Sequence, residues 1–187
     1  MAEPERYGVN IVAAQVEDPL VQEAFRDQEW TKVYNKAVDY IQKDKIDKAK
    51  KKIETAILIH PKKEENYLTL AAIHIQDNDI DAALKTANRG LDANDESSVL
   101  YELKADILLQ NNSDISKMES AKELYQIAIK YSDDSGPIKI KLLNIYIELG
   151  HNEQAIDFAD DLLNAVINNS DRNPSYVKRD QFRHPYE

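Results

Sequence analysis

Residues 64–97 show the hydrophobic pattern of the chain most clearly. At the spacing of one helix face, the first part carries Tyr67, Leu70, Ala71 and His74. The polar stretch from Gln76 to Asp79 follows, and its Asn and Asp side chains can bond their own backbone and cap a following helix. A second helix face then carries Ile80, Ala83, Ala87 and Leu91. The pattern predicts two short helices joined by a polar turn, with Gly90 allowing them to pack closely.

Small residues repeat along the chain at a fixed interval of 34 positions. The parallel series are Ala37, Ala71 and Ala105; Ala49 and Ala83; Ala56 and Gly90; and Ile46 and Ile80. The same interval separates Tyr67 from Tyr101, Ala121 from Ala155, and Ala128 from Leu162. A helix pair of this size cannot bury both of its faces alone, so it needs neighbours of its own kind. Several series in one register indicate a stack of repeated helix pairs.

This period, with small residues at matched places, resembles the tetratricopeptide repeat family. The resemblance covers about residues 30–170 and divides them into four helix pairs, at 30–63, 64–97, 98–135 and 136–170. It implies an all-α fold, a right-handed superhelical solenoid of antiparallel helix pairs. The third pair departs from the period, because a predicted turn from Gln110 to Lys117 adds four residues. In the fourth pair Leu143 and Asn152 replace a small and an apolar residue.

Both ends of the chain lie outside this register. Asp18-Pro19 is a favourable helix start, and an apolar stripe follows it at Leu20, Val21, Ala24 and Phe25. We expect residues 1–29 to be an N-terminal extension whose helix covers the open end of the solenoid. The apolar stretch 11–16 is a strand-like arm or a helical turn, and it packs with this cover or folds back into a groove. The aromatic tail, residues 171–187, is either disordered or a docking segment.

Composition narrows the possible functions. The chain has 187 residues, a formal net charge of −10, no cysteine and four glycines, which excludes disulfides, thiolate chemistry and Gly-rich phosphate loops. The acidic total argues against nucleic acid as a partner. No apolar run is long enough to span a membrane, and the start lacks a secretory signal, so we expect a cytoplasmic protein. The lysine cluster at 43–52 is interpreted as a solvated outer face rather than a docking site for anions.

The residues that carry enzyme chemistry are scattered. The histidines are His60, His74, His151 and His184, and none has a second His or a carboxylate at metal-ligand spacing. His74 is expected on the buried face of its helix. The sequence has no nucleophile-elbow or phosphate-loop motif. We therefore expect a protein that is not an enzyme, with no catalytic residue, metal or cofactor.

The family resemblance implies that the first helices of successive pairs line a concave groove that holds a peptide or helix. On that basis the candidate partner-binding residues are Tyr34, Val38, Ile41, Leu68, Thr69, Ala72, Ile75, Val99, Glu102, Asp106, Leu109, Ile140, Asn144 and Ile147. Most are apolar, with acidic residues at intervals, so the expected partner is an apolar helix or extended peptide of another protein. A basic residue of that partner would meet Asp106.

One subset of the family clamps the acidic tail of heat-shock chaperones with basic and amide side chains. The matching places here hold Tyr34, Val38, Thr69, Val99 and Leu103. None of these is basic, so binding of the acidic tail of a heat-shock chaperone is not expected. The remaining functions are scaffold or adaptor, chaperone for an apolar segment of a client, and self-assembly into homo-oligomers through the terminal segments. Some lining residues can instead face a neighbouring helix.

Overall fold

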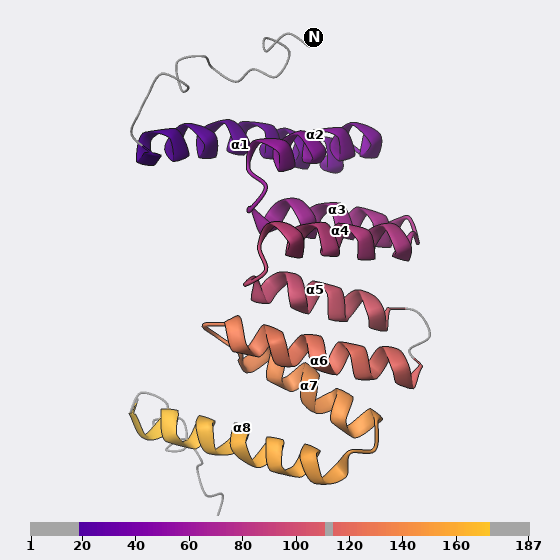
Figure 1. Cartoon of the computed structure of the whole chain (residues 1–187), viewed down its shortest axis with the longest axis vertical. Coiled ribbons are helices and arrows are strands. Elements are labelled where there is room, and N and C mark those ends of the chain that lie inside the picture. The colour runs from indigo at the N-terminus through magenta and orange to yellow at the C-terminus, as the bar shows by residue number, and fades with distance from the viewer. Residues whose placement is uncertain (1–18, 111–113, 173–187) are drawn as a thin grey trace, which may run out of the picture.

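A computed structural model describes residues 19–110 and 114–172, and every element in these ranges is an α-helix. The helices are α1 (Pro19–Gln42), α2 (Ile46–Ile59), α3 (Glu64–Gln76), α4 (Ile80–Ala93), α5 (Ser98–Leu109), α6 (Ile115–Tyr131), α7 (Gly136–Glu148) and α8 (Asn152–Arg172). Figure 1 shows them stacked along the long axis, with α1 and α2 at one end and α8 at the other. Each helix contacts the next in the chain, and α3 also contacts α5. The described chain is therefore an all-α solenoid, as the sequence predicts.

The small residues of the 34-residue series lie where helices meet. Ala37, Ala71 and Ala105, from the first helices of three successive pairs, have no exposed surface. The matched residues of the second helices are also buried: Ala49, Ala56, Ala83, Gly90, Ala121, Ala128 and Ala155. Larger side chains fill the space between these close contacts, among them Tyr67, Leu70, Leu100 and Leu142. Buried small residues thus recur at the 34-residue interval seen in the sequence.

The turns inside three of the pairs share one geometry. Asp44, Asn78 and Gly150 each follow a first helix with a positive φ, of 54°, 58° and 73°. After each of them, the next backbone N–H bonds a carbonyl five residues back; Asp79 N, for example, donates to His74 O at 2.8 Å. This is the Schellman ending of a helix, and Asp, Asn and Gly are the residues that tolerate the left-handed conformation it needs. Asp79 then caps α4, because its carboxylate accepts from Ala82 N at 3.0 Å. The predicted polar turn and cap are both present.

Two boundaries differ from those expected. The helix that starts at Pro19 continues without a break to Gln42, so the expected N-terminal cover and the first helix of the first repeat are one helix, α1. The predicted turn from 110 to 117 is shorter, because the Asp114 carboxylate accepts from Lys117 N at 2.8 Å and starts α6 at Ile115. The inserted residues thus lengthen the second helix as well as the turn. Residues 11–16 and the tail beyond 172 lie outside the described residues.

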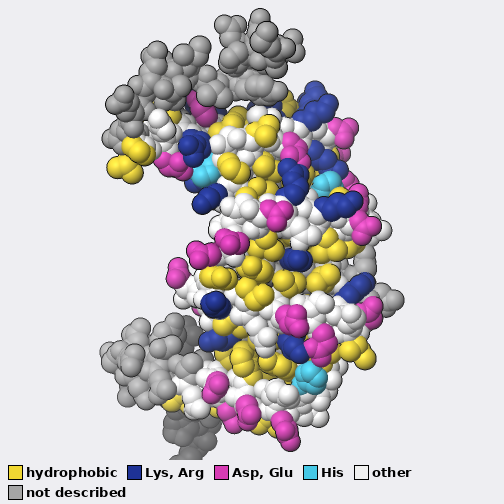
Figure 2. All heavy atoms as spheres, viewed as in Figure 1, with side chains coloured by type: hydrophobic (Ala, Val, Ile, Leu, Met, Phe, Trp, Pro, Cys, Tyr) yellow, Lys and Arg dark blue, Asp and Glu magenta, His cyan; other side chains and the backbone are white. Residues whose placement is uncertain are grey.

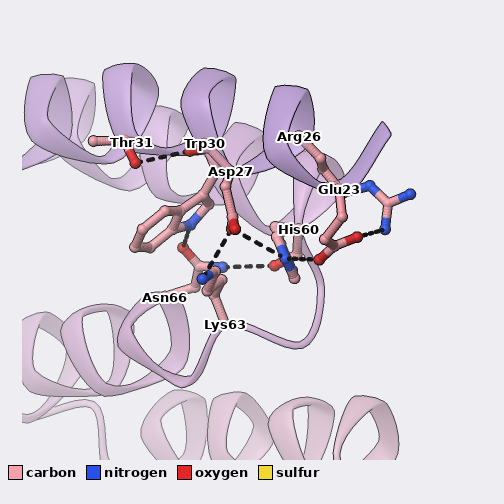
Figure 3. A network of polar contacts seen from close by, with 8 residues as sticks. All are labelled: Glu23, Arg26, Asp27, Trp30, Thr31, His60, Lys63 and Asn66. Atoms are coloured by element: carbon pink, nitrogen blue, oxygen red, sulfur yellow. Dashed lines mark hydrogen bonds and ion pairs between the residues drawn. The ribbon is translucent and has the colours of Figure 1, made fainter. Parts of the chain in front are cut away.

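A polar network fastens the N-terminal half of α1 to the connection between α2 and α3 (Figure 3). His60 Nε2 lies 2.8 Å from Glu23 Oε1, and Lys63 Nζ lies 2.9 Å from Asp27 Oδ1. Deeper in the network, Trp30 Nε1 donates to the buried Asn66 Oδ1 at 2.9 Å. The hydrogen bond from Lys63 holds the pKa of Asp27 below its ordinary value. This network gives the first repeat a fixed position on the second.

None of the helices in the described ranges is both long and apolar enough to cross a membrane.

Candidate partner-binding groove

The predicted groove residues all keep some exposed surface. Those partly exposed are Tyr34, Val38, Ile41, Leu68, Thr69, Ile75, Glu102, Asp106 and Leu109; those exposed are Ala72, Val99, Ile140, Asn144 and Ile147. They lie on α1, α3, α5 and α7, the first helices of the pairs. Figure 2 shows that hydrophobic side chains are visible along the middle of the stack, with acidic and basic side chains between and around them.

Some of these residues also bond or pack between helices. Tyr34 OH and Thr69 Oγ1 lie 2.6 Å apart and link α1 to α3. Ile41, Ile75 and Leu109, at matched places in three repeats, pack against the buried core clusters. These five side chains therefore serve the seams between first helices as well as the surface.

The most exposed large apolar residues of the set are on α7. Ile140 is 58% exposed and Ile147 is 56% exposed. With Asn144 between them, they occupy the i, i+4 and i+7 places of one helix face. Val99 on α5 is 38% exposed. These residues make this face of α7 the candidate contact surface.

Next to this face a pocket of about 330 Å³ opens between α5, α6 and α7. Its lining residues are Asp106, Leu109, Tyr125, Lys141, Asn144, Ile145 and Glu148. Asp106, Leu109 and Asn144 belong to the predicted groove, so the structure brings part of that set together around one concavity.

A cluster of charged residues forms one side of the pocket. Lys141 Nζ donates to both carboxylate oxygens of Asp106, at 2.9 and 2.7 Å, and lies 2.8 Å from Glu102 Oε1. Tyr125 OH donates to Asp106 Oδ1 at 2.6 Å. Burial, together with the hydrogen bond to Asp106, raises the pKa of Tyr125 well above its ordinary range. Burial lowers the pKa of Lys141, but its bonds to Asp106 and Glu102 outweigh that effect and the net shift is upward. Tyr125 therefore stays a neutral donor and Lys141 stays charged near neutral pH.

Lys141 and Tyr125 are missing from the residues predicted from the sequence. Lys141 immediately follows Ile140 on α7, a first helix. This position alone could have placed it among the predicted groove residues. Tyr125 is on α6, a second helix, and lines the pocket together with residues of α5 and α7. The interval of the repeats gives no indication of such a contact.

The described residues contain one group of metal-capable side chains, Glu23, Asp27 and His60, whose ligand atoms lie within 4.8 Å of one another. Arg26 and Lys63 already pair with the two carboxylates. The group is accounted for by the network that fastens α1. His74, expected on the buried face of its helix, is only partly buried.

The fold defines a class of protein, an all-α solenoid of successive helix pairs. Residues 40–107 match the family model described as tetratricopeptide repeat. The same helix pairing continues on both sides of that segment. Residues 40–107 therefore belong to the tetratricopeptide repeat family, and the described helices share its fold. No curated protein sequence gives a significant match.

Solved structures with the same fold include three different proteins. MamA aligns with a TM-score of 0.56 at 16% identity, covering 72% of both chains. The first tetratricopeptide repeat domain of Spaghetti (RPAP3), bound to the HSP90 peptide SRMEEVD, aligns with a TM-score of 0.53 at 16% identity, covering 66% of this chain and 94% of that one. The type III secretion translocator chaperone SycD of Yersinia enterocolitica aligns with a TM-score of 0.51 at 16% identity, covering 69% and 93%. At these identities the likeness concerns the fold.

Proposed function

We propose that this protein is a protein-interaction module that binds an apolar helix or extended peptide of a partner along the surface of α1, α3, α5 and α7. The observation that carries the proposal is the exposed apolar face of α7, with Ile140 and Ile147 beside a pocket. Burying such side chains against a partner removes apolar area from water, which favours association. The protein would then act as a scaffold, an adaptor or a subunit of an assembly.

Two of the similar structures support an interaction role. The Spaghetti domain holds a peptide in its structure, and SycD is a chaperone. The peptide held by the Spaghetti domain ends in Glu-Glu-Val-Asp and is acidic. Such a ligand does not suit this chain. Tyr34 and Thr69 hydrogen-bond each other, and the carboxylate of Asp106 would repel an acidic peptide. We therefore propose a less acidic and more apolar partner.

A chaperone for an apolar client segment is a second candidate, favoured by the likeness to SycD. A chaperone would bind its client through the same surface as a scaffold, but it would release the client afterwards instead of staying in the assembly. Binding to a peptide that stands for the client tests the surface in both cases.

The experiment is a selection of peptides that bind the purified full chain. A random dodecapeptide library displayed on phage is the probe, and selected peptides are then synthesised and titrated by fluorescence anisotropy. The double variant Ile140→Asn/Ile147→Asn removes the apolar face of α7 without changing charge. We expect it to lose roughly tenfold or more in affinity, since each buried aliphatic side chain contributes ~1.5–3 kcal/mol when fully covered.

The matched control is Leu58→Asn/Ile156→Asn, the same change on second helices, where these residues are 75% and 62% exposed. It should bind as the wild type does. If the control loses the peptides and the α7 variant keeps them, the binding surface lies on the second helices. If the library gives no binder at all, the proposal is wrong.

A further inference from the structure

We infer that the pocket between α5, α6 and α7 receives an arginine side chain of the partner segment. The inference rests on the proposed function, because it specifies one feature of the peptide that the groove binds. It depends on which hydrogen-bonding atoms of the pocket are already used and which remain.

The cation of the pocket is fully engaged. Lys141 Nζ has three oxygen neighbours within 2.9 Å, two on Asp106 and one on Glu102. An ammonium group has three hydrogens to donate. An anionic ligand would therefore have to break an existing ion pair before it could meet Lys141.

The second donor of the pocket is engaged as well. Tyr125 has one hydroxyl hydrogen, and it goes to Asp106 Oδ1 at 2.6 Å. Tyr125 is 2% exposed, so its hydroxyl cannot turn to a ligand without leaving a buried group unsatisfied. Asn144 is the one other side-chain donor among the lining residues, and its amide can equally accept.

The acceptors, in contrast, exceed what the pocket's own donors use. Each ionised carboxylate has about four lone-pair sites. Asp106 accepts three bonds, and Glu102 has one ion-pair contact, through Oε1. Glu148 lines the pocket, is exposed, and forms no ion pair among the described residues. Asp106 and Glu148 line the pocket, and Glu102 pairs with Lys141 beside it, so three carboxylates stand against one ammonium group. The charge left over is negative and attracts a cation.

Arginine fits this arrangement better than lysine. Its planar guanidinium carries five donors in a fork that can reach two carboxylates and an amide oxygen at once, whereas lysine offers a compact point charge. The apolar part of an arginine side chain would lie against Leu109 and Ile145, which also line the pocket. Ile140 and Ile147 are exposed on α7 and directly precede the lining residues Lys141 and Glu148, so we expect the matching peptide to have an arginine between apolar residues.

The test uses the dodecapeptides selected on the wild-type chain. We expect arginine to be enriched at one position between apolar residues. Replacing that arginine with citrulline, which has nearly the same shape and no charge, should lower affinity roughly tenfold, as expected for a hydrogen bond to a charged group. Replacing it with lysine should cost less than citrulline does.

The variant Glu148→Gln links the effect to the pocket. It should weaken binding of the arginine peptide several-fold and leave the citrulline peptide unchanged. Glu123→Gln, the same charge change at an exposed position of α6 outside the pocket, should alter neither. Asp106→Asn is a second variant with the same expected pattern, used after its melting temperature has been compared with that of the wild type.

The outcomes separate this inference from the proposed function. Selected peptides without a basic residue that still lose affinity to Ile140→Asn/Ile147→Asn would overturn the arginine pocket and leave the groove standing. Equal losses for Glu148→Gln and Glu123→Gln would show general charge attraction and would also overturn it. Peptides indifferent to the α7 variant would overturn both proposals.

Discussion

Replacing Gly90 with alanine tests how closely the repeats are packed. Gly90 is buried in α4, where the next repeat presses against it. A Cβ atom added there would lie 3.0 Å from Leu100 Cδ1, 3.0 Å from Tyr67 Cγ and 3.1 Å from Leu100 Cδ2. Neither neighbour can easily withdraw. Leu100 has no exposed surface, and the Tyr67 ring is held by its hydroxyl, which donates to Pro61 O at 2.7 Å.

Two opposing effects set the magnitude. Alanine is favoured over glycine in a helix interior by ~1 kcal/mol. Overpacking of a filled core costs ~1–3 kcal/mol. Because all three close contacts are with buried atoms, we expect overpacking to exceed the helix gain and Gly90→Ala to destabilise the fold by about 1 kcal/mol. A domain of this size then melts ~2–4 °C lower.

Urea unfolding followed by far-UV circular dichroism and by the fluorescence of Trp30 measures the change, and agreement of the two probes checks for a single transition. Asn88→Ala is the control, since it adds an alanine to an exposed position of the same helix and should stabilise by a few tenths of a kcal/mol. Leu100→Val should cost less in the Gly90→Ala background than in the wild type, because it relieves the contact. An increase in stability for Gly90→Ala would refute the close packing of α4 against α3 and α5.

Two further predictions concern stability. Ala71→Leu should lower the free energy of unfolding by ~1–3 kcal/mol, since Ala71 has no exposed surface. The control Ala72→Leu, at the neighbouring exposed position, should change it by less than about 0.5 kcal/mol. Equal effects of the two substitutions would show that the register is wrong. Arg89 donates two hydrogen bonds to Glu54, at 2.9 and 2.8 Å, and holds the pKa of Glu54 below 4.5. A lowered carboxylate pKa contributes stability above the unfolded-state value of 4.5 that is lost as pH falls through the folded-state value. Because the pair is nearly half exposed, Arg89→Gln should cost less than about 1 kcal/mol near neutral pH, and the difference from wild type should shrink in acid; a constant difference down to strongly acidic pH would contradict this.

The repeat architecture could be predicted because it depends on residues that recur at a fixed interval and on the local chemistry of turns and caps. Ala37, Ala71 and Ala105 stand at a fixed interval and are all fully buried. Asn78 and Asp79 signal a turn and a cap by their own side-chain chemistry, and both form as expected. These features depend on the residue itself and on its neighbours within one helix pair.

Other features could not be predicted, because they depend on contacts across pairs. The hydrogen bonds that Lys141 of the next repeat and Tyr125 of a second helix donate to Asp106 were not predicted. Spacing along one helix does not say which side chain of a neighbouring helix will reach it. Helix boundaries were also misjudged, since no helix-breaking residue separates residue 29 from residue 30 and α1 runs through.

The most direct test of the groove is to map where a selected peptide touches the protein. Backbone amide shifts of the full chain, recorded by nuclear magnetic resonance during a titration with the peptide, report this helix by helix. We expect shifts centred on α5 and α7 near Asp106, Asn144 and Ile147, extending to α3 and α1. Shifts confined to α2, α4, α6 and α8 would place the partner on the other face and contradict the account.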